Sequence, residues 1–491
     1  MAGLISAELA DALHRMNPWW SGRPGVLLPP HRRHLVAQIR RRIDQRLAQI
    51  VVVRGSRQIG KTTAQLQIIE DLLGEEVAAK RVFRVQFDEL EALLSMEIPI
   101  FALVQWFEEN VLKATLNEAA HRGTPALLFF DEVQNLPTWA PQLKLLVDHS
   151  TVQVVVTGSS ALRIELGRDS LAGRITTIEA GTLSLTEIAA LRDIELGRPF
   201  LADNGLDPLT RLEFWESLRE HGRALAEPRD LTFRHFSQRG GYPLMHLRAE
   251  VPMEALASQL NETVIRRVIQ HDLGVGDEGR DGALLEEIFR IACRHVGQAP
   301  SLQTFVNELS TTLNANIKSQ LVGQYLQFLA DTLLLRLIEP LEIRLKKKAS
   351  SPKLCLADHA LRASWLHEEV PLVPEGLTEM PALATMAGYL AESVVGATLS
   401  TVNALALNYS PERKDQRELD FVMTIGTKRI PIEVKYQRSP DPVRDTQGLR
   451  SFIDKAVNNA PFGILVTQRD TDVDFGPGVV ALPLSTLMLL R

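Results

Sequence analysis

Short apolar runs alternate with longer amphipathic segments from about residue 50 onward. The runs are rich in Val, Ile, Leu and Phe and carry few charges, which is typical of strands that helices cover on both faces. The segments between them repeat their apolar positions with the period of a helix. This alternation predicts an α/β domain built on a mostly parallel sheet. The candidate strands are 50–54, 81–87, 126–131, 152–158 and 175–180.

The second half of the chain shows a different order of elements. Residues 185–275 are mainly helical by periodicity. Three helical segments and a pair of extended segments follow, which is the outline of a winged helix-turn-helix, and a second α/β pattern begins near residue 350. The three helices are expected at 281–296, 301–309 and 317–331, the extended pair at Leu333–Leu337 and Leu341–Leu345, and the later strands near 404–410, 418–425, 429–436 and 462–467.

The composition is that of a soluble globular protein, with 45% apolar and 23% charged residues. A chain of 491 residues exceeds one compact core and suggests about three domains. The formal charge of -6 provides no general attraction to nucleic acid, so DNA binding would need local basic patches. Only Cys293 and Cys355 are present, which excludes a disulfide framework. The start of the chain lacks the pattern of a signal peptide and no apolar run suggests a membrane span, so we expect a cytoplasmic protein.

The aromatic and basic residues near the N-terminus each allow two interpretations. Residues 1–47 look like a helical lead-in that prolines interrupt. Trp19 and Trp20 either anchor this segment against the following domain or stack on a base. Arg32-Arg33-His34 and Arg40-Arg41-Arg42 form either a solvated helix face or a nucleic-acid contact, and the same alternatives apply to Lys346-Lys347-Lys348.

One segment carries a specific phosphate-binding pattern. Gly55-Ser56-Arg57-Gln58-Ile59-Gly60-Lys61-Thr62 fits the P-loop at every specified position, with an apolar strand before it and a helical run after it. Its glycines let backbone N–H groups approach the phosphates of ATP, and the helix adds its positive end. Lys61 is expected to reach the β and γ phosphates, and Thr62 to bind Mg²⁺. The expected nucleotide-binding residues are Gly55, Ser56, Arg57, Gln58, Ile59, Gly60, Lys61, Thr62 and Thr63.

A second element complements the P-loop. Leu127-Leu128-Phe129-Phe130-Asp131-Glu132 is an apolar strand that ends in two adjacent carboxylates. Asp131 suits a hold on Mg²⁺, and Glu132 is placed to polarise the attacking water. The alternative is that Glu132 only caps the strand end. The candidate strand 81–87 is expected between this element and the P-loop strand, the arrangement of AAA+ and RecA-like ATPases, in which a strand is inserted between the two motifs and the base follows the Mg²⁺ carboxylate.

Two further positions could contact the phosphates. The strand 152–158 leads into a polar cluster in which Thr157 or Ser159 could sense the γ-phosphate or only satisfy the strand end. Arg174 begins the next strand. It could reach the phosphates in the same chain or across the interface of a homo-oligomer, or it could form a surface salt bridge.

Together these motifs resemble the AAA_14 ATPases of bacteria and archaea. The resemblance implies an AAA-type P-loop fold and the use of ATP with Mg²⁺. Members commonly carry a C-terminal DUF4143 region, and residues 232–491 resemble it. The segments that carry the likeness are Gly55–Thr63, Asp131-Glu132-Val133-Gln134 with Trp139, Thr157-Gly158-Ser159-Ser160, Leu171-Ala172-Gly173-Arg174, the Gly240-Gly241-Tyr242-Pro243 turn and the helix that ends in Val268-Ile269-Gln270-His271-Asp272-Leu273.

A second candidate site lies near the C-terminus. Two expected strands, joined by a turn at Gly426, carry Asp420 on the first and Glu433 and Lys435 on the second. Neighbouring antiparallel strands bring such side chains to one face, so the carboxylates could converge on a divalent cation, Mg²⁺ or Mn²⁺. Lys435 could then activate a water beside the metal. The alternatives are ordinary cross-strand ion pairs and a folded but inactive domain.

This C-terminal arrangement resembles the PD-(D/E)xK nuclease core, a restriction-endonuclease-like α/β fold. The resemblance implies a further metal-binding acid on an upstream helix, and Glu392 corresponds to it. Leu419 stands where the name of that family has Pro, a residue that is often absent in such enzymes.

The leading hypothesis is an ATPase whose nucleotide cycle controls a DNA-binding, metal-dependent nuclease domain. The alternatives are an ATP-operated clamp and a signalling scaffold, for DNA or a protein partner, in which the nuclease-like domain is inactive. The expected domains are a helical lead-in (1–47), a P-loop ATPase domain (48–200), a helical connector (201–280), a winged-helix-like domain (281–348) and a nuclease-like domain (349–491).

Overall fold

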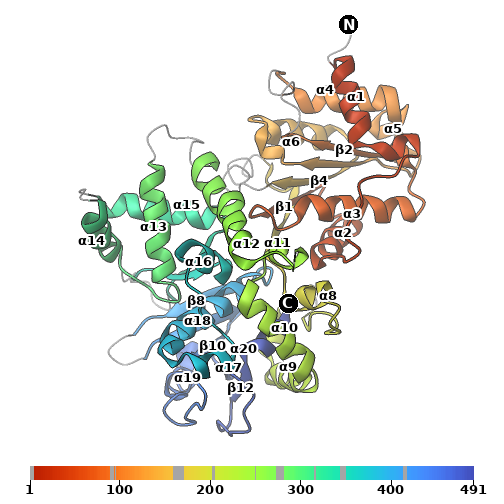
Figure 1. The fold of residues 1–491 in the computed structure, drawn as a ribbon. Helices are drawn as coiled ribbons and strands as arrows, with labels where there is room; N and C mark the ends of the chain where they lie inside the picture. The colour runs from red at the N-terminus through yellow and green to blue at the C-terminus, as the bar shows by residue number, and fades with distance from the viewer. Residues whose placement is uncertain are drawn as a thin grey trace. The chain divides into compact units, whose positions relative to one another are not determined.

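The chain forms two compact units in the computed structural model, unit 1 (Met1–Ala180) and unit 2 (Gly181–Arg491), both drawn in Figure 1. This division is coarser than the five expected domains, whose boundaries stay a prediction. The structure describes residues 5–88, 93, 96–158, 171–201, 205–248, 250–272, 281–313, 317–342, 350–412 and 417–491.

Unit 1 is built on a parallel sheet of five strands in the order β2-β3-β4-β1-β5. All five predicted strands are confirmed. The strand that separates the P-loop strand β1 from β3 is β4, whereas the predicted strand 81–87, observed as β2, lies at the edge of the sheet. The bounds are β1 Ile50–Gly55, β2 Val82–Gln86, β3 Leu127–Asp131, β4 Gln153–Gly158 and β5 Ile175–Ala180.

Helices cover both faces of this sheet, as Figure 1 shows. On one face, alternate strand residues such as Val52, Phe83 and Phe130 share an apolar core with the helices α1, α4 and α6. Helices α2 and α3 contact β1, β4 and β5. The bounds are α1 Ala7–Met16, α2 His34–Gln45, α3 Lys61–Gly74, α4 Pro99–Phe107, α5 Leu116–His121 and α6 Trp139–His149.

The N-terminal tryptophans anchor the lead-in to the sheet, which confirms the interpretation that they pack against the following domain. Trp19 Nε1 and Trp20 Nε1 both donate to the carbonyl of Val82, at 3.1 and 2.9 Å. Trp20 also lies near the rings of Phe83 and Phe107, with centroid distances of 5.8 and 6.0 Å. These contacts fix the lead-in to the edge strand β2.

Acidic neighbours pair with two arginines of the basic run. Arg32 bonds Glu70 at 2.7 Å and Asp71 at 2.8 Å, and Arg40 bonds Glu75 at 2.6 Å. These contacts favour the solvated helix face over a nucleic-acid contact for this run.

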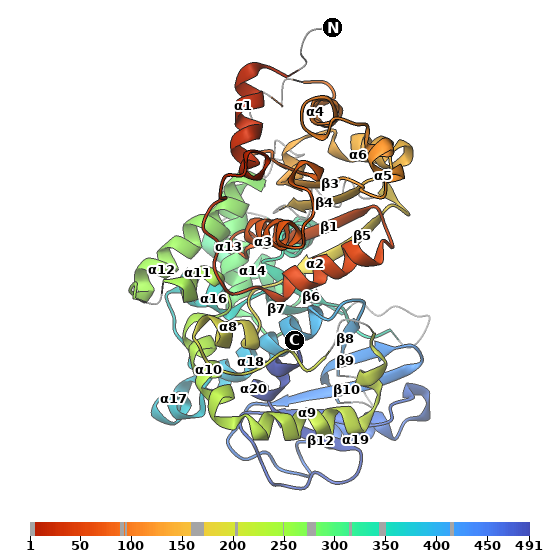
Figure 2. The same cartoon turned by 90° about the vertical axis from the view of Figure 1, so that its right-hand side faces the viewer.

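Unit 2 contains a second sheet of five strands in the order β12-β11-β10-β9-β8, parts of which Figure 2 shows. Strands β8, β9 and β10 pair antiparallel, whereas β10, β11 and β12 pair parallel. The four predicted strands are confirmed, and β12 is an additional one. The bounds are β8 Ala406–Ser410, β9 Leu419–Ile425, β10 Lys428–Lys435, β11 Gly463–Thr467 and β12 Val479–Pro483.

Helices make up most of the remaining part of unit 2, as the helical periodicity predicts. Their bounds are α8 Leu185–Leu191, α9 Leu212–Ala224, α10 Ala226–Arg239, α11 Pro243–Leu247, α12 Met253–Leu260 with further helical turns at Asn261–Arg266 and Val268–Asp272, α13 Gly282–Arg294, α14 Leu302–Leu313, α15 Ser319–Asp331, α16 His359–Leu366, α17 Pro374–Glu379, α18 Ala384–Ser400, α19 Gln447–Ile453 and α20 Leu484–Leu487.

The three helices α13, α14 and α15 are followed by a two-stranded antiparallel sheet, β6 Leu335–Ile338 with β7 Lys353–Leu356. The structure pairs β6 with β7, and at the start of the expected second strand Pro340 bridges Tyr409 and Leu341 N donates to the Tyr409 carbonyl at 2.7 Å. Residues 343–345 of that expected strand lie outside the described residues. The Lys346-Lys347-Lys348 cluster lies outside the described residues. The winged-helix assignment therefore stays a prediction.

Helix α18 packs across β6, β7, β8 and β10. It approaches the strands closely, because a Cβ at Gly396 would lie 3.0 Å from the ring of Phe421. Within the described residues, the stretch Pro381–Ser400 is long and apolar enough to cross a membrane by length and composition alone. The expectation that no apolar run is long enough to span a membrane was therefore wrong for length and composition. Buried core helices of soluble proteins also meet these two criteria.

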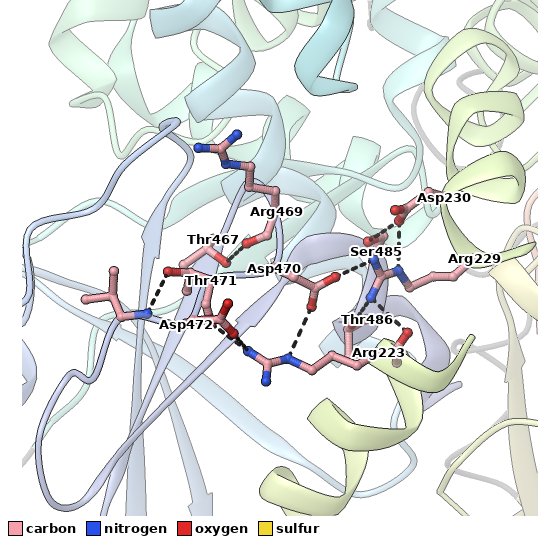
Figure 3. A network of polar contacts seen from close by, with 12 residues as sticks. Arg223, Arg229, Asp230, Thr467, Arg469, Asp470, Thr471, Asp472, Ser485 and Thr486 are labelled. Carbon is pink, nitrogen blue, oxygen red and sulfur yellow. Dashed lines mark hydrogen bonds and ion pairs between the residues drawn. The ribbon is translucent and has the colours of Figure 1, made fainter. Parts of the chain in front are cut away.

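A buried arginine joins α10 to the loop after β11 and to α20, as Figure 3 shows. Arg229 is 1% exposed, and its guanidinium donates to Asp470 at 2.6 Å and to Thr486 Oγ1 at 2.8 Å. From α9, Arg223 pairs with Asp472 at 3.1 Å. These contacts tie the helical part of unit 2 to its second sheet.

Candidate functional site

The P-loop follows β1 directly and ends where α3 begins at Lys61. A side chain at Gly55 would contact Ile59 and would place a Cβ 2.7 Å from the carbonyl of Ala180, so only glycine fits there. Gly60 has a φ of 88°, which also favours glycine. The loop therefore keeps its backbone compact in front of a helix N-terminus, the arrangement that binds phosphate groups.

Lys61 lies at the centre of this loop. Its side chain is buried, and Nζ donates to the carbonyls of Gly55 at 2.9 Å and Ser56 at 2.8 Å. Thr62 follows in the first turn of α3 and is half-buried. The loop thus holds an ammonium group and a hydroxyl group side by side, as phosphate and Mg²⁺ binding require.

Asp131 ends β3 and is fully buried. It accepts hydrogen bonds from Thr157 Oγ1 and, at 3.1 Å, from Arg84 Nη2. Since β1, β3 and β4 are parallel neighbours, their carboxyl ends place Asp131 and Thr157 on the same edge of the sheet as the P-loop. Oxygen ligands such as Thr62 and Asp131 suit Mg²⁺, which keeps several waters and needs few protein ligands.

Glu132 directly follows the buried strand. Its backbone is left-handed, with φ 52° and ψ 40°, which is uncommon for a residue with a side chain and clusters at functional sites. Gln134 Nε2 donates to Glu132 Oε2 at 2.5 Å. A carboxylate oriented in this way beside the P-loop edge fits the expected role in polarising water.

The predictions for Ser159 and Arg174 as phosphate contacts have different outcomes. Ser159 lies outside the described residues, so its role stays a prediction. Arg174 lies at the amino end of β5, because Ile50 pairs with Ile175 and Gly55 with Ala180. The P-loop is at the opposite edge of the sheet, and Arg174 instead pairs with Asp148 at 2.5 and 3.0 Å. The prediction that Arg174 contacts the phosphates within its own chain is therefore wrong. A contact with the phosphates across a subunit interface stays a prediction.

Two arginines near the P-loop edge were missed in the sequence. Arg84 sits on β2 and is 5% exposed, and it bonds Gln65 and Gln86 as well as Asp131. A charge inside a predicted buried strand was the available signal, because buried charges need partners. Arg33 donates to the carbonyl of Ile59 at 2.5 Å, a contact that no local pattern predicts.

The second candidate site lies in unit 2, and its predicted residues do come together. Asp420 on β9 and Glu433 on β10 are each 8% exposed. Asp420 Oδ2 accepts from the backbone N–H of Val434 at 2.8 Å, and Lys435 Nζ donates to Glu433 Oε1 at 2.5 Å. Glu392, on α18, joins the group through a residue that the sequence analysis did not single out.

That residue is Lys353, the first residue of β7, which is 1% exposed. Its Nζ donates to Glu392 Oε2 and to Asp420 Oδ1, both at 2.8 Å. Burial and the nearby Asp420 raise the pKa of Glu433 to about 8, while burial also raises the pKa of Glu392. For Asp420, burial acts to raise the pKa, but Lys353, the N–H of Val434 and Lys435 together lower the pKa below its usual value.

The predicted second metal site does not fit this arrangement. Across the described ranges, no three His, Cys, Asp or Glu residues are placed to share a metal ion. The proposed ligands Glu392 and Asp420 instead share an ammonium group. The expectation of Mg²⁺ or Mn²⁺ held by Glu392, Asp420 and Glu433 is therefore unsupported.

The fold and the first site together define a P-loop ATPase of the AAA class. Residues 47–189 match the AAA_14 family model, described as an AAA domain, and residues 387–487 match DUF4143, a domain of unknown function. The two matches support the resemblance to the P-loop ATPases that combine an AAA_14 domain with a DUF4143 region. Residues 231–370 match a separate domain of unknown function, DUF8612, so two models cover the region expected to resemble DUF4143 alone.

Solved structures show only distant similarity. The Walker-type ATPase PABY2304 of Pyrococcus abyssi is 12% identical, with a TM-score of 0.39 over 70% of this chain and 99% of that one. The STAND protein PH0952 of Pyrococcus horikoshii, which has a tetratricopeptide repeat sensor, is 13% identical, with a TM-score of 0.27 over 78% and 50%. Domain III of the Thermotoga maritima replication initiation protein DnaA is 13% identical, with a TM-score of 0.24 over 49% and 95%. No curated protein matches the chain.

Proposed function

We propose that this protein binds and hydrolyses ATP at the P-loop of unit 1, and that its nucleotide cycle controls the binding of DNA by unit 2. The observation that carries the proposal is the shared sheet edge on which Lys61, Asp131 and Glu132 follow parallel strands. This set contains a phosphate-binding lysine, a carboxylate for the Mg²⁺ site and a candidate base.

Each of these residues has a distinct task in the proposed hydrolysis. The loop N–H groups and Lys61 would bind and orient the phosphates, while Glu132 would accept a hydrogen bond from the attacking water. Thr62 and Asp131 would hold Mg²⁺, which supplies charge neutralisation on the β and γ phosphates when bound. Thr157 and Arg84, through their bonds to Asp131, would keep that carboxylate oriented.

The case for DNA as the partner rests on unit 2. Its three helices followed by a two-stranded sheet have the outline predicted for a winged helix-turn-helix, and β8–β12 carry the nuclease-like Asp420, Glu433 and Lys435. Because Lys353 occupies the space between two of the expected metal ligands, the arrangement favours a clamp over a working nuclease. Metal-dependent cleavage under the control of ATP is the competing hypothesis.

A DNA-binding and cleavage assay distinguishes these functions. Full-length protein would be incubated with single-stranded, duplex and branched DNA, with Mg²⁺ or Mn²⁺ and with ATP, ADP or no nucleotide. A clamp predicts retention of DNA that changes with the nucleotide and no strand breakage. Breakage that Asp420→Ala abolishes, and that the exposed control Asp454→Ala leaves intact, would establish the nuclease instead. Failure to retain DNA or to respond to nucleotide would contradict the proposal.

A further inference from the structure

We propose that Lys353 is an internal cation that takes the place of a divalent metal ion in the carboxylate centre of unit 2. The inference goes beyond the ATP cycle, since it concerns only residues of α18, β7, β9 and β10. Its starting point is that one ammonium group joins two carboxylates that come from different elements, Glu392 of α18 and Asp420 of β9.

The backbone of Lys353 is fixed on both sides. Lys353 pairs with Ile338 in the small sheet of β6 and β7. The next residue, Leu354, donates to the carbonyl of Gln298 at 2.8 Å, and Leu356 N donates to Ser393 Oγ of α18 at 2.9 Å. Because this strand is held on both sides, a movement of the backbone does not account for the position of the ammonium, which its carboxylate partners hold in the centre.

The surroundings of the ammonium are those of a built cation site. Nζ lies 5.3 Å from the ring centroid of Phe421 and 5.9 Å from that of Tyr409, within the range of cation–π attraction. Two carboxylate oxygens lie 2.8 Å away, and Glu418 lies at 3.8 Å. Aromatic faces and carboxylates together compensate the burial of a charge that is almost fully removed from water.

A divalent ion would need the same position. Mg²⁺ requires oxygens at about 2.1 Å and Ca²⁺ at about 2.3–2.6 Å, so Glu392 and Asp420 would have to close around it and expel Nζ. Glu433 would then be the third ligand, because its Oε2 has no hydrogen-bond partner among the described residues. Removal of the lysine charge should consequently create a metal site from the buried Asp420 and Glu433 and the partly buried Glu392.

The test uses electron paramagnetic resonance to measure how Mn²⁺ binds to nucleotide-free full-length protein. Four proteins are compared: wild type, Glu433→Gln, Lys353→Met and the double variant Lys353→Met/Glu433→Gln. We expect wild type and Glu433→Gln to bind Mn²⁺ alike. Lys353→Met should gain one site with affinity raised by about tenfold or more, and the double variant should lose it.

Two results would overturn the proposal. One is wild-type binding of Mn²⁺ that Glu433→Gln weakens, because the centre would then accept metal with Lys353 in place. The other is a folded Lys353→Met protein that gains no site, because the lysine would then be an ordinary ion-pair partner. If Lys353→Met does not fold, the comparison of wild type with Glu433→Gln decides. ATP hydrolysis, measured in parallel, should stay within about twofold of wild type for Glu433→Gln, which separates this test from that of the ATPase proposal.

Discussion

The two carboxylate centres of this protein use similar side chains with different results. In unit 1, Arg84 bonds a single carboxylate among the described residues, Asp131, beside a P-loop that supplies the other groups needed for ATP. In unit 2, Lys353 bonds two carboxylates that would both have to bind the same metal ion. The comparison separates a buried cation that orients one carboxylate from a buried cation that bridges two carboxylates expected to bind a metal ion.

The largest effect is expected for ATP hydrolysis at the P-loop site of unit 1. Glu132→Gln should keep ATP binding but lower the hydrolysis rate by about 10²- to 10⁴-fold, because the amide cannot serve as a base. Phosphate release and binding of a fluorescent ATP analogue would be measured separately. Glu109→Gln, an exposed glutamate of the same unit, is the matched control and should hydrolyse ATP normally. Unchanged hydrolysis in Glu132→Gln would mean that this residue only caps β3.

The next effect concerns the stability of unit 2. Lys353→Met should lower its free energy of unfolding by about 3–5 kcal/mol without metal, since it leaves the buried Asp420 and the partly buried Glu392 without their cation. Denaturant unfolding followed by circular dichroism would measure it, with the exposed Lys428→Met of β10 as control. A loss equal to that of the control would show that the buried ion pairs do not stabilise this centre.

A smaller effect is expected on the pH dependence of stability. The pKa of Glu433 is raised from 4.5 to about 8 in the folded state, by burial first and by Asp420 second, with Lys435 and Lys353 acting against this rise. The folded state therefore binds more protons than the unfolded state between these values, and this residue lowers stability as pH rises from 4.5 to 8. Glu433→Gln should flatten that decline in urea titrations at several pH values. An equally steep decline in the variant would assign it to other groups.

The smallest effect is expected for Arg174. Because it pairs with Asp148 at the sheet edge opposite the P-loop, Arg174→Ala should change the hydrolysis rate by less than about twofold. The rate would be measured over a range of protein concentrations. A large loss that appears only at concentrations where the protein assembles would instead support a contact with ATP across a subunit interface.

The elements of the fold that could be predicted from sequence are those with a local signal. The buried runs at β1 and β3 are continuous and apolar, and the P-loop needs glycine at defined positions, so the ATPase half was predictable. The partner strand of β6 was not predictable. The apolar segment from Leu341 looks like a strand that could pair with β6, but Leu341 bonds Tyr409. Pairing depends on residues far away in the sequence, which periodicity does not contain.

The same reason explains what was missed at the second site. Asp420, Glu433 and Lys435 were found because paired strands bring nearby residues to one face. Lys353 lies 67 positions before Asp420, and nothing in its own segment marks it as a partner. The prediction therefore contained the acids of the centre but not the charge that occupies it.

Phosphate release by purified full-length protein with Mg²⁺ tests whether the P-loop site hydrolyses ATP. We predict measurable turnover by wild type and by the exposed-site control Lys80→Ala, and a loss of about 100-fold or more in Lys61→Ala, because Lys61 stabilises the charge on the transferred phosphate. Equal turnover by Lys61→Ala and wild type would mean that the P-loop is not the site of ATP hydrolysis.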